Sequence, residues 1–209
     1  MAHFKIRHLI IGSKYISMIF APTYLPLLVM GLLFLFSYLN MLPWFYKLFI
    51  LLLVYCFTVL LPTILIKFYY KHRNLNLLQL SSKEYRIIPY AISIVCYFAG
   101  MLALEKLHVP HFMATILLSA LIIQGVCALI NALWWKPSTH AAGAGGVIGA
   151  FMAFSIIFSF NPLVWFSIMI IIAGFVGSSR IVLHQNGVLQ IFVSFLIGAV
   201  CANLIILLI

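Results

Sequence analysis

The chain has 209 residues, of which 66% are hydrophobic and only 7% are charged, and its net charge is +10. This composition is typical of integral membrane proteins and leaves no room for a separate soluble domain, so residues 1–209 are expected to form one membrane domain. The apolar runs are far longer than the alternating strands of an outer-membrane barrel. They therefore predict an all-α, polytopic bundle of transmembrane helices.

The polar residues exclude several kinds of chemistry. The sequence has no aspartate, and Glu84 and Glu105 are its only carboxylates. Paired-carboxylate hydrolases, intramembrane aspartyl proteases and carboxylate-held magnesium sites are therefore disfavoured. The four cysteines lie in apolar runs without CxxC or CxxH spacing, which predicts no metal site and no cofactor. The basic excess favours an anionic or phosphorylated membrane lipid as partner, and no basic soluble face exists to bind nucleic acid.

The hydrophobic segments predict about seven crossings of the bilayer, because each is close to the 20 or so residues that one crossing needs. A basic amphipathic stretch, 1–16, precedes the first crossing, and no signal-peptide cleavage site follows it. Pro22 and Pro26 lie in the first span and can kink it. The predicted spans are 17–39, 46–69, 88–105, 112–134, 140–160, 163–185 and 188–209.

Three polar stretches connect these spans, at 71–87, 135–140 and 178–187. With seven crossings, all three stretches share one side of the membrane with the amino terminus. Ten of the twelve lysines and arginines lie on that side. The positive-inside rule alone can produce such a bias, and it then predicts a cytoplasmic location for this side. Ionisable groups that gather at membrane depth are also often functional.

The stretch KPSTHAAGAGGVIG, which begins at Lys136, predicts a helix start. Pro137 marks a break, and Ser138 and Thr139 are good capping residues. A helix start presents unpaired N–H groups and a positive dipole end, which suit a phosphate, although a capped membrane helix without a ligand is the alternative. The small residues Ala141, Gly145 and Gly149, at four-residue spacing, predict close helix packing.

A second basic and imidazole pair lies near the end of the sixth span. Arg180 and His184 are four residues apart, so on a helix they share one face. Together with His140 they suit metal-independent phosphoryl transfer. In that chemistry one imidazole attacks phosphorus, the other protonates the departing oxygen, and cations stabilise the transition state.

From about Lys71 to its end the sequence resembles the type 2 phosphatidic acid phosphatase (PAP2) superfamily of membrane lipid phosphatases. Three motifs, KxxxxxxRP, PSGH and SRxxxxxHxxxD, mark that family. The segment PSTH, ending at His140, is similar to the second motif, and Ser179-Arg180 to the start of the third, whose close is similar to SFLIG at 194–198. The resemblance implies a PAP2-like core in which His140 protonates the leaving group and Arg180, Ser138 and Lys136 bind phosphate.

The third motif is degenerate. Counted without gaps, its nucleophilic histidine falls on Asn186 and its supporting aspartate on Gln190, and His184 lies two positions early. An amide cannot form a phosphohistidine, so either His184 takes over as nucleophile or the site binds phosphate without cleaving it. The first motif is reduced to Arg86, with Lys83 as a substitute for its lysine.

Two functions follow. The first is a metal-independent phosphatase of a lipid phosphate or lipid pyrophosphate, that is, a phosphoric-monoester or diphosphate hydrolase. The alternative is an inactive PAP2-like protein that binds anionic lipid or serves as a membrane subunit of a larger complex. The catalytic candidates are His184 as nucleophile and His140 as acid, and the phosphate-binding candidates are Lys136, Ser138, Thr139, Arg180, Arg86 and Lys83.

A transporter is disfavoured, because no inverted repeat is evident and coupling carboxylates are missing. The expected location is a bacterial inner membrane. The resemblance places the polar face in the periplasm, whereas the charge bias places it in the cytoplasm.

Overall fold

The computed structural model describes residues 2–36, 38–72, 83–133, 135–159, 161 and 163–208, with the backbone alone for 2–9, 36, 38, 40 and 83–87. Every regular element in this part of the chain is helical, as predicted. The elements are α1 (Ala2–Ile19), α2 (Leu25–Phe36), η1 (Tyr38–Met41), α3 (Trp44–Tyr55), the π-helical turn η2 (Cys56–Leu60), α4 (Leu61–His72), α5 (Lys83–Lys106), α6 (His111–Leu133), α7 (Thr139–Ile157), α8 (Leu163–Val182) and α9 (Val188–Leu208).

Six helices in the described residues are long and apolar enough to cross a bilayer. The first is the continuous rod from Trp44 to His72, which joins α3, η2 and α4, and the others are α5 from Ile88 onward, α6, α7, α8 and α9. These six agree with the predicted spans from the second onward to within a few residues. The chain is therefore a multi-pass membrane protein built as a helical bundle.

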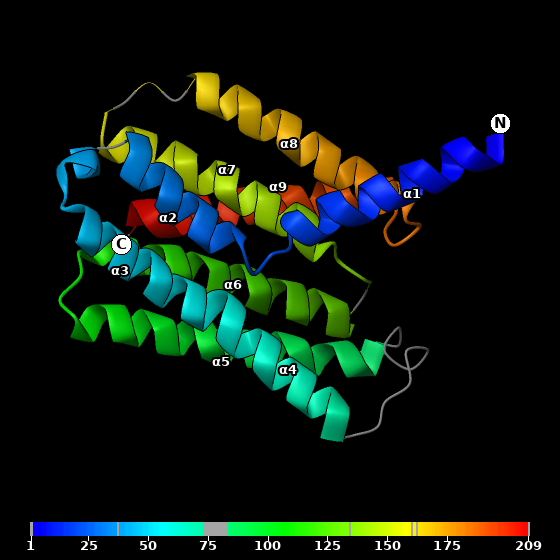
Figure 1. The fold of residues 1–209 in the computed structure, drawn as a ribbon, viewed down its shortest axis with the longest axis horizontal. Helices are drawn as coiled ribbons and strands as arrows, with labels where there is room; N and C mark the ends of the chain where they lie inside the picture. The colour runs from blue at the N-terminus through cyan, green and yellow to red at the C-terminus, as the bar shows by residue number, and fades with distance from the viewer. Residues whose placement is uncertain are drawn as a thin grey trace.

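The prediction of one continuous first span over 17–39 is wrong. α1 ends at Ile19 and α2 begins only at Leu25, and the 12 residues of α2 are too few for one crossing. Pro22 has no N–H to continue the helix, whereas Pro26 fits the first turn of α2, where an N–H would have no partner. Figure 1 shows α1 and α2 following one another along the bundle in two pieces.

Helix α7 is the most buried of the six crossing helices, and its small residues explain why. A Cβ on Gly145 would overlap the carbonyl oxygen of Phe195 in α9, and a Cβ on Gly149 would overlap that of Ala199. In α9, a Cβ on Gly198 would in turn overlap the carbonyl oxygen of Ala142 in α7. The predicted close packing of the small-residue stripe is confirmed, and α9 is its partner.

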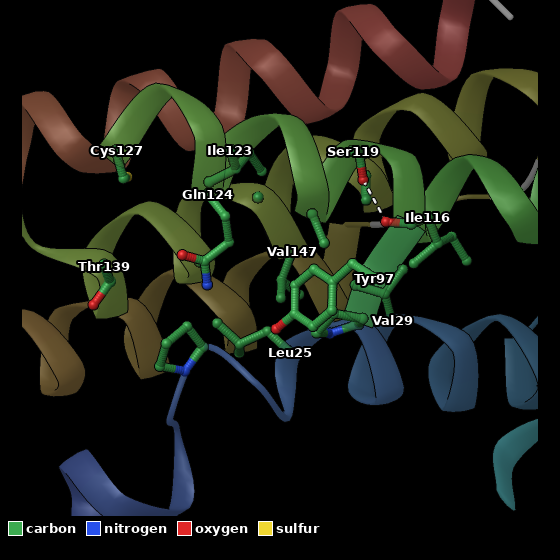
Figure 2. Close-up of a pocket in the computed structure, with 16 residues that line it drawn as sticks. Leu25, Val29, Tyr97, Ile116, Ser119, Ile123, Gln124, Cys127, Thr139 and Val147 are labelled. Carbon is green, nitrogen blue, oxygen red and sulfur yellow. Dashed lines mark hydrogen bonds between the residues drawn. The ribbon is translucent and has the colours of Figure 1, made fainter. Parts of the chain in front are cut away.

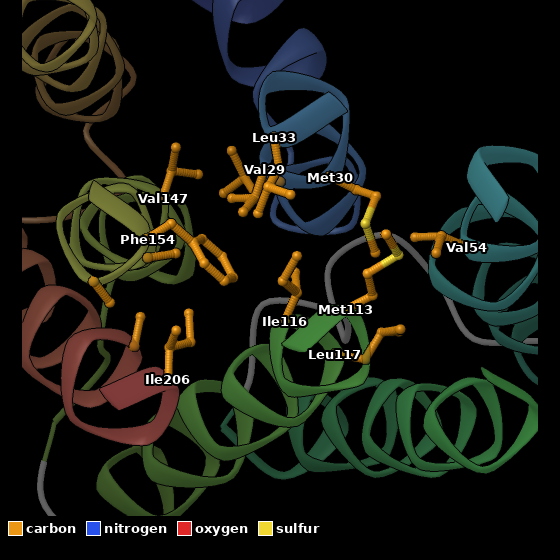
Figure 3. Close-up of a cluster of buried hydrophobic side chains, with 14 of the residues drawn as sticks. Val29, Met30, Leu33, Val54, Met113, Ile116, Leu117, Val147, Phe154 and Ile206 are labelled. Atoms are coloured by element: carbon orange, nitrogen blue, oxygen red, sulfur yellow. The ribbon is translucent and has the colours of Figure 1, made fainter. Parts of the chain in front are cut away.

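The short helix α2 packs between α3 and α7 and over α6 through apolar contacts. Figure 3 shows its side chains meeting those of α3, α6 and α7, with α9 closing the cluster beside α7. Met30, Met113 and Leu117 are fully buried there. This packing holds α2 against its neighbours although it is too short to cross the bilayer. The labelled residues of the cluster are Val29, Met30, Leu33, Val54, Met113, Ile116, Leu117, Val147, Phe154 and Ile206.

The connection 135–138, before α7, and the connection 183–187, before α9, lie at the same end of the bundle (Figure 1). The end of α4 and the start of α5 lie there as well, and α1 extends outward from this end. We call it the polar end. The carboxyl terminus lies at the opposite end, where the first of the six crossing helices begins. The side chains of Lys83 and Arg86 lie outside the described residues.

Candidate anion-binding site

Ser138 begins α7 as predicted, but its hydroxyl is buried. Its backbone is extended, its Oγ accepts the N–H of Ala141 at 3.4 Å, and only 1% of the residue is exposed. Its own N–H donates to the Oγ of Ser194 in α9 at 3.0 Å. These bonds satisfy donors at the helix start that a ligand would otherwise use. Ser138 therefore caps α7 and joins it to α9.

The sixth span ends earlier than predicted, and this changes the position of His184. α8 stops at Val182, and His184 has a left-handed backbone with a φ of 52°. The N–H of His184 donates to the carbonyl of Ile181 at 2.9 Å, and that of Gln185 to Arg180 at 3.1 Å. This is the pattern of a left-handed helix cap. The expectation that Arg180 and His184 share a helix face is therefore wrong, because His184 lies beyond the helix.

Asn186 and Gln190, the positions that correspond to the histidine and aspartate of the third motif, contact one another as amides. The Nδ2 of Asn186 donates to the Oε1 of Gln190 at 3.3 Å and to the carbonyl of Lys136 at 3.3 Å. The same Oε1 accepts the N–H of Gly187 at 3.1 Å. Asn186 is buried. The amide pair thus ties the connection before α9 to the connection before α7.

A cavity of about 530 Å³ opens at the polar end. Four of the predicted site residues, Lys136, Thr139, Arg180 and His184, line it. They come from the connection before α7, the first residue of α7, the end of α8 and the turn after it. The other lining residues are Pro22, Thr23, Tyr70, Pro89, Tyr90, Ser93, Gln124, Pro137 and Gln185.

His140 and Arg180 meet at one residue of α1. The Nε2 of His140 lies 3.0 Å from the carbonyl oxygen of Ser17, and the Nη1 of Arg180 donates to the Oγ of Ser17 at 3.0 Å. Because a carbonyl only accepts, the proton of the His140 ring is on Nε2 and points at α1. Ring and guanidinium are therefore neighbours, as the sequence suggested, but the ring faces α1 and is not among the groups that line the cavity.

A narrow apolar pocket of about 40 Å³ adjoins the cavity between α2, α5, α6 and α7. Pro22, Gln124 and Thr139 border both spaces. Figure 2 shows Gln124, Thr139 and the hydroxyl of Tyr97 at this pocket, with Leu25, Val29 and Val147 forming apolar walls. A ligand with a polar head and an apolar body would therefore find both kinds of surface side by side.

The sequence did not single out Ser17, Thr23, Tyr90 or Gln124. Each is a common polar or aromatic residue inside an apolar helix or loop, and only the fold brings it to the polar end.

The described residues hold no group of three or more histidine, cysteine or acidic side chains that could bind a metal ion.

Comparisons of the chain with protein-family models, with curated proteins and with solved structures found no match. The resemblance to the PAP2 superfamily therefore depends on the motif residues quoted above, and membership of that family stays a prediction. What the chain shows directly is a multi-pass helical membrane protein with basic and imidazole side chains around one cavity at its polar end.

Proposed function

We propose that this protein binds the phosphate group of an anionic membrane lipid in the cavity at its polar end. The observation that carries the proposal is the convergence of Lys136, Arg180 and His184, from separate segments, on a single cavity. Two of these side chains are permanent cations, and Thr139 adds a hydroxyl donor at the same wall. Guanidinium and ammonium groups form the strongest hydrogen bonds when the acceptor is a phosphate.

The position of the cavity favours a lipid over a free phosphate ion. The cavity lies among the ends of membrane-crossing helices, and the apolar pocket shown in Figure 2 adjoins it. A free phosphate would leave that apolar surface uncovered. A phosphate attached to a hydrocarbon would contact both surfaces, and the burial of its apolar part would add to the affinity.

Binding can be tested with purified protein in detergent, using dioleoyl phosphatidate as probe and dioleoyl phosphatidylcholine and inorganic phosphate as comparisons. We expect phosphatidate to bind tightest. Arg180→Gln and Lys136→Gln should each weaken binding about 10- to 150-fold, because a hydrogen bond to a charged group contributes about 1.5–3 kcal/mol. Lys106→Gln, at the end of α5 away from the polar end, is the matched control. Equal binding of phosphatidate and phosphatidylcholine by the parent would refute the proposal.

Hydrolysis of the bound phosphate is the second candidate, and the position of His184 favours it. Its imidazole borders the same cavity as Arg180 and Lys136. In this reaction a nitrogen of His184 attacks phosphorus, the bond from phosphorus to the lipid oxygen breaks, and that oxygen takes up a proton. Water then hydrolyses the phosphohistidine. The proton of His140 is bonded to Ser17, so His140 would have to turn toward the cavity to supply it.

Release of inorganic phosphate from dioleoyl phosphatidate and from a polyprenyl diphosphate separates the two candidates. If the protein is a phosphatase, His184→Gln abolishes release while phosphatidate binding persists. His72→Gln, at the exposed end of α4, is the control histidine. A parent that binds phosphatidate and releases no phosphate leaves lipid binding as the function and eliminates hydrolysis.

The sidedness of the cavity follows from the charge bias. Ten of the twelve lysines and arginines belong to segments that the sequence assigns to this side of the membrane, and this bias favours a cytoplasmic location in a bacterial inner membrane. A reporter fused after Ile209 should then be active in the periplasm, because the carboxyl terminus is at the opposite end. A cytoplasmic reporter signal would instead agree with the periplasmic site of the family that the sequence resembles.

A further inference from the structure

The end of helix α1 leaves a carbonyl without a helical partner, and His140 supplies one. The last four carbonyls of a helix have no N–H within the helix to bond. At the end of α1, the N–H of Phe20 donates to Ile16 and that of Ala21 to Met18. Neither uses the carbonyl of Ser17, which instead accepts the Nε2–H of His140 at 3.0 Å. His140 on α7 therefore caps α1 and holds its last turn in place.

The side chain of Ser17 is also hydrogen-bonded to Arg180. Its Oγ accepts from the Nη1 of Arg180 at 3.0 Å, and Arg180 borders the cavity while Ser17, only 8% exposed, does not. An arginine side chain has several rotatable bonds and five N–H donors. A hydrogen bond to a buried hydroxyl restricts the orientations of the guanidinium, and the side chain it orients borders the cavity.

We propose that Ser17 is a positioning residue of the anion site, which aims Arg180 at the bound phosphate, and that His140 acts through it by fastening α1. The inference rests on the proposed binding of a lipid phosphate. It assigns α1 a part in that site, and it gives His140 a structural task that is separate from proton donation. Ordering Arg180 in advance reduces the entropy lost on binding, so the hydroxyl of Ser17 strengthens binding without touching the ligand.

The test is the affinity for dioleoyl phosphatidate in detergent. Ser17→Ala should weaken binding about 3- to 10-fold, because the long side chain of Arg180 must then be ordered during binding. Ser17→Thr keeps a hydroxyl and should restore the parent's affinity. Ser13→Ala is the matched control, since Ser13 lies one turn earlier on the same helix and is also 8% exposed. It should leave the affinity unchanged.

A double-mutant cycle distinguishes a positioning role of Ser17 from a general loss of packing in the bundle. In an Arg180→Gln background, Ser17→Ala should cause no further loss, because the guanidinium that the hydroxyl orients is absent. His140→Ala should weaken binding in the parent background and add little to Ser17→Ala. Equal losses from Ser17→Ala with and without Arg180 would overturn the inference.

The outcomes of these experiments distinguish a failure of this inference from a failure of the proposed function. If the parent binds phosphatidate selectively and Ser17→Ala binds as well as the parent, only the positioning role is refuted. If Ser17→Ala binds more tightly than the parent, α1 competes with the ligand, and positioning is again refuted. If the parent does not distinguish phosphatidate from phosphatidylcholine, the proposed function fails and the inference fails with it.

Discussion

The glycine contacts between α7 and α9 give the sharpest test of the packing that supports the site. Gly149→Ala adds one methyl group, whose carbon would overlap the carbonyl oxygen of Ala199 and lie 2.9 Å from its Cα. The obstructing atoms are backbone, so no side chain can rotate away. Helix α9 must therefore shift away from α7, because packed interiors have little free volume.

The expected loss of stability is about 1–3 kcal/mol, the usual range for overpacking a filled interior. Opposing it is the gain of about 0.5–1 kcal/mol from replacing glycine by alanine within a helix. Gly174→Ala isolates that gain, since a Cβ on Gly174 in α8 meets no atom within 4 Å. Gly149→Ala should therefore lower the midpoint of thermal unfolding by several degrees, whereas Gly174→Ala should leave it unchanged or raise it.

The assay is thermal unfolding of both variants in the same detergent, followed by size-exclusion chromatography of the protein that remains monodisperse. A second readout follows from the bonds across these helices. Displacement of α9 pulls Ser194 away from the N–H of Ser138 and Asn186 away from the carbonyl of Lys136, so phosphatidate binding should weaken together with stability. A Gly149→Ala variant as stable as Gly174→Ala would refute the proposed backbone contact.

Three further changes test single interactions by thermal unfolding. Asn131→Leu should stabilise the protein by about 1–2 kcal/mol, because this amide is 1% exposed and neither its Oδ1 nor its Nδ2 has a partner in the described structure. A loss of stability would show that the amide forms hydrogen bonds in the folded protein. Ser194→Ala should destabilise by about 1–3 kcal/mol, since the buried N–H of Ser138 loses its acceptor; no change would contradict this. His184→Gly should stabilise by about 1 kcal/mol by relieving a left-handed backbone, and a lower midpoint would show that the imidazole makes stabilising contacts.

Hydrophobic length predicted most of the fold, and local backbone chemistry accounts for its main error. The six crossing helices match apolar runs because lipid requires each backbone to satisfy its own hydrogen bonds. The first span contains an equally apolar run, yet Pro22 ends one helix and Pro26 fits the start of another. Composition could not show that the break would be tolerated, because that depends on the burial of α2 by its neighbours.

The candidate site was predicted in part. Lys136, Thr139, Arg180 and His184 were expected together, and they border one cavity because three connections lie at one end of the bundle. Arg180 and His184 were expected to share a helix face, and this was wrong, since α8 ends before His184. Ser17 could not be predicted, because nothing in an isolated serine shows that two helices distant in sequence will bond to it. The roles assigned to these residues stay predictions.

The charge of Arg180 gives a reason for an anion at this position. Glu105 ends α5 away from the polar end, and the side chain of Glu84, the other carboxylate, lies outside the described residues. In the described part of the site, the groups that meet Arg180 include the last turn of α1, whose carbonyl end carries about half a negative charge. A full positive charge among membrane helices is costly, and such charges often mark a functional site. A lipid phosphate in the cavity would bring a negative charge close to Arg180, and this attraction would favour binding of the ligand.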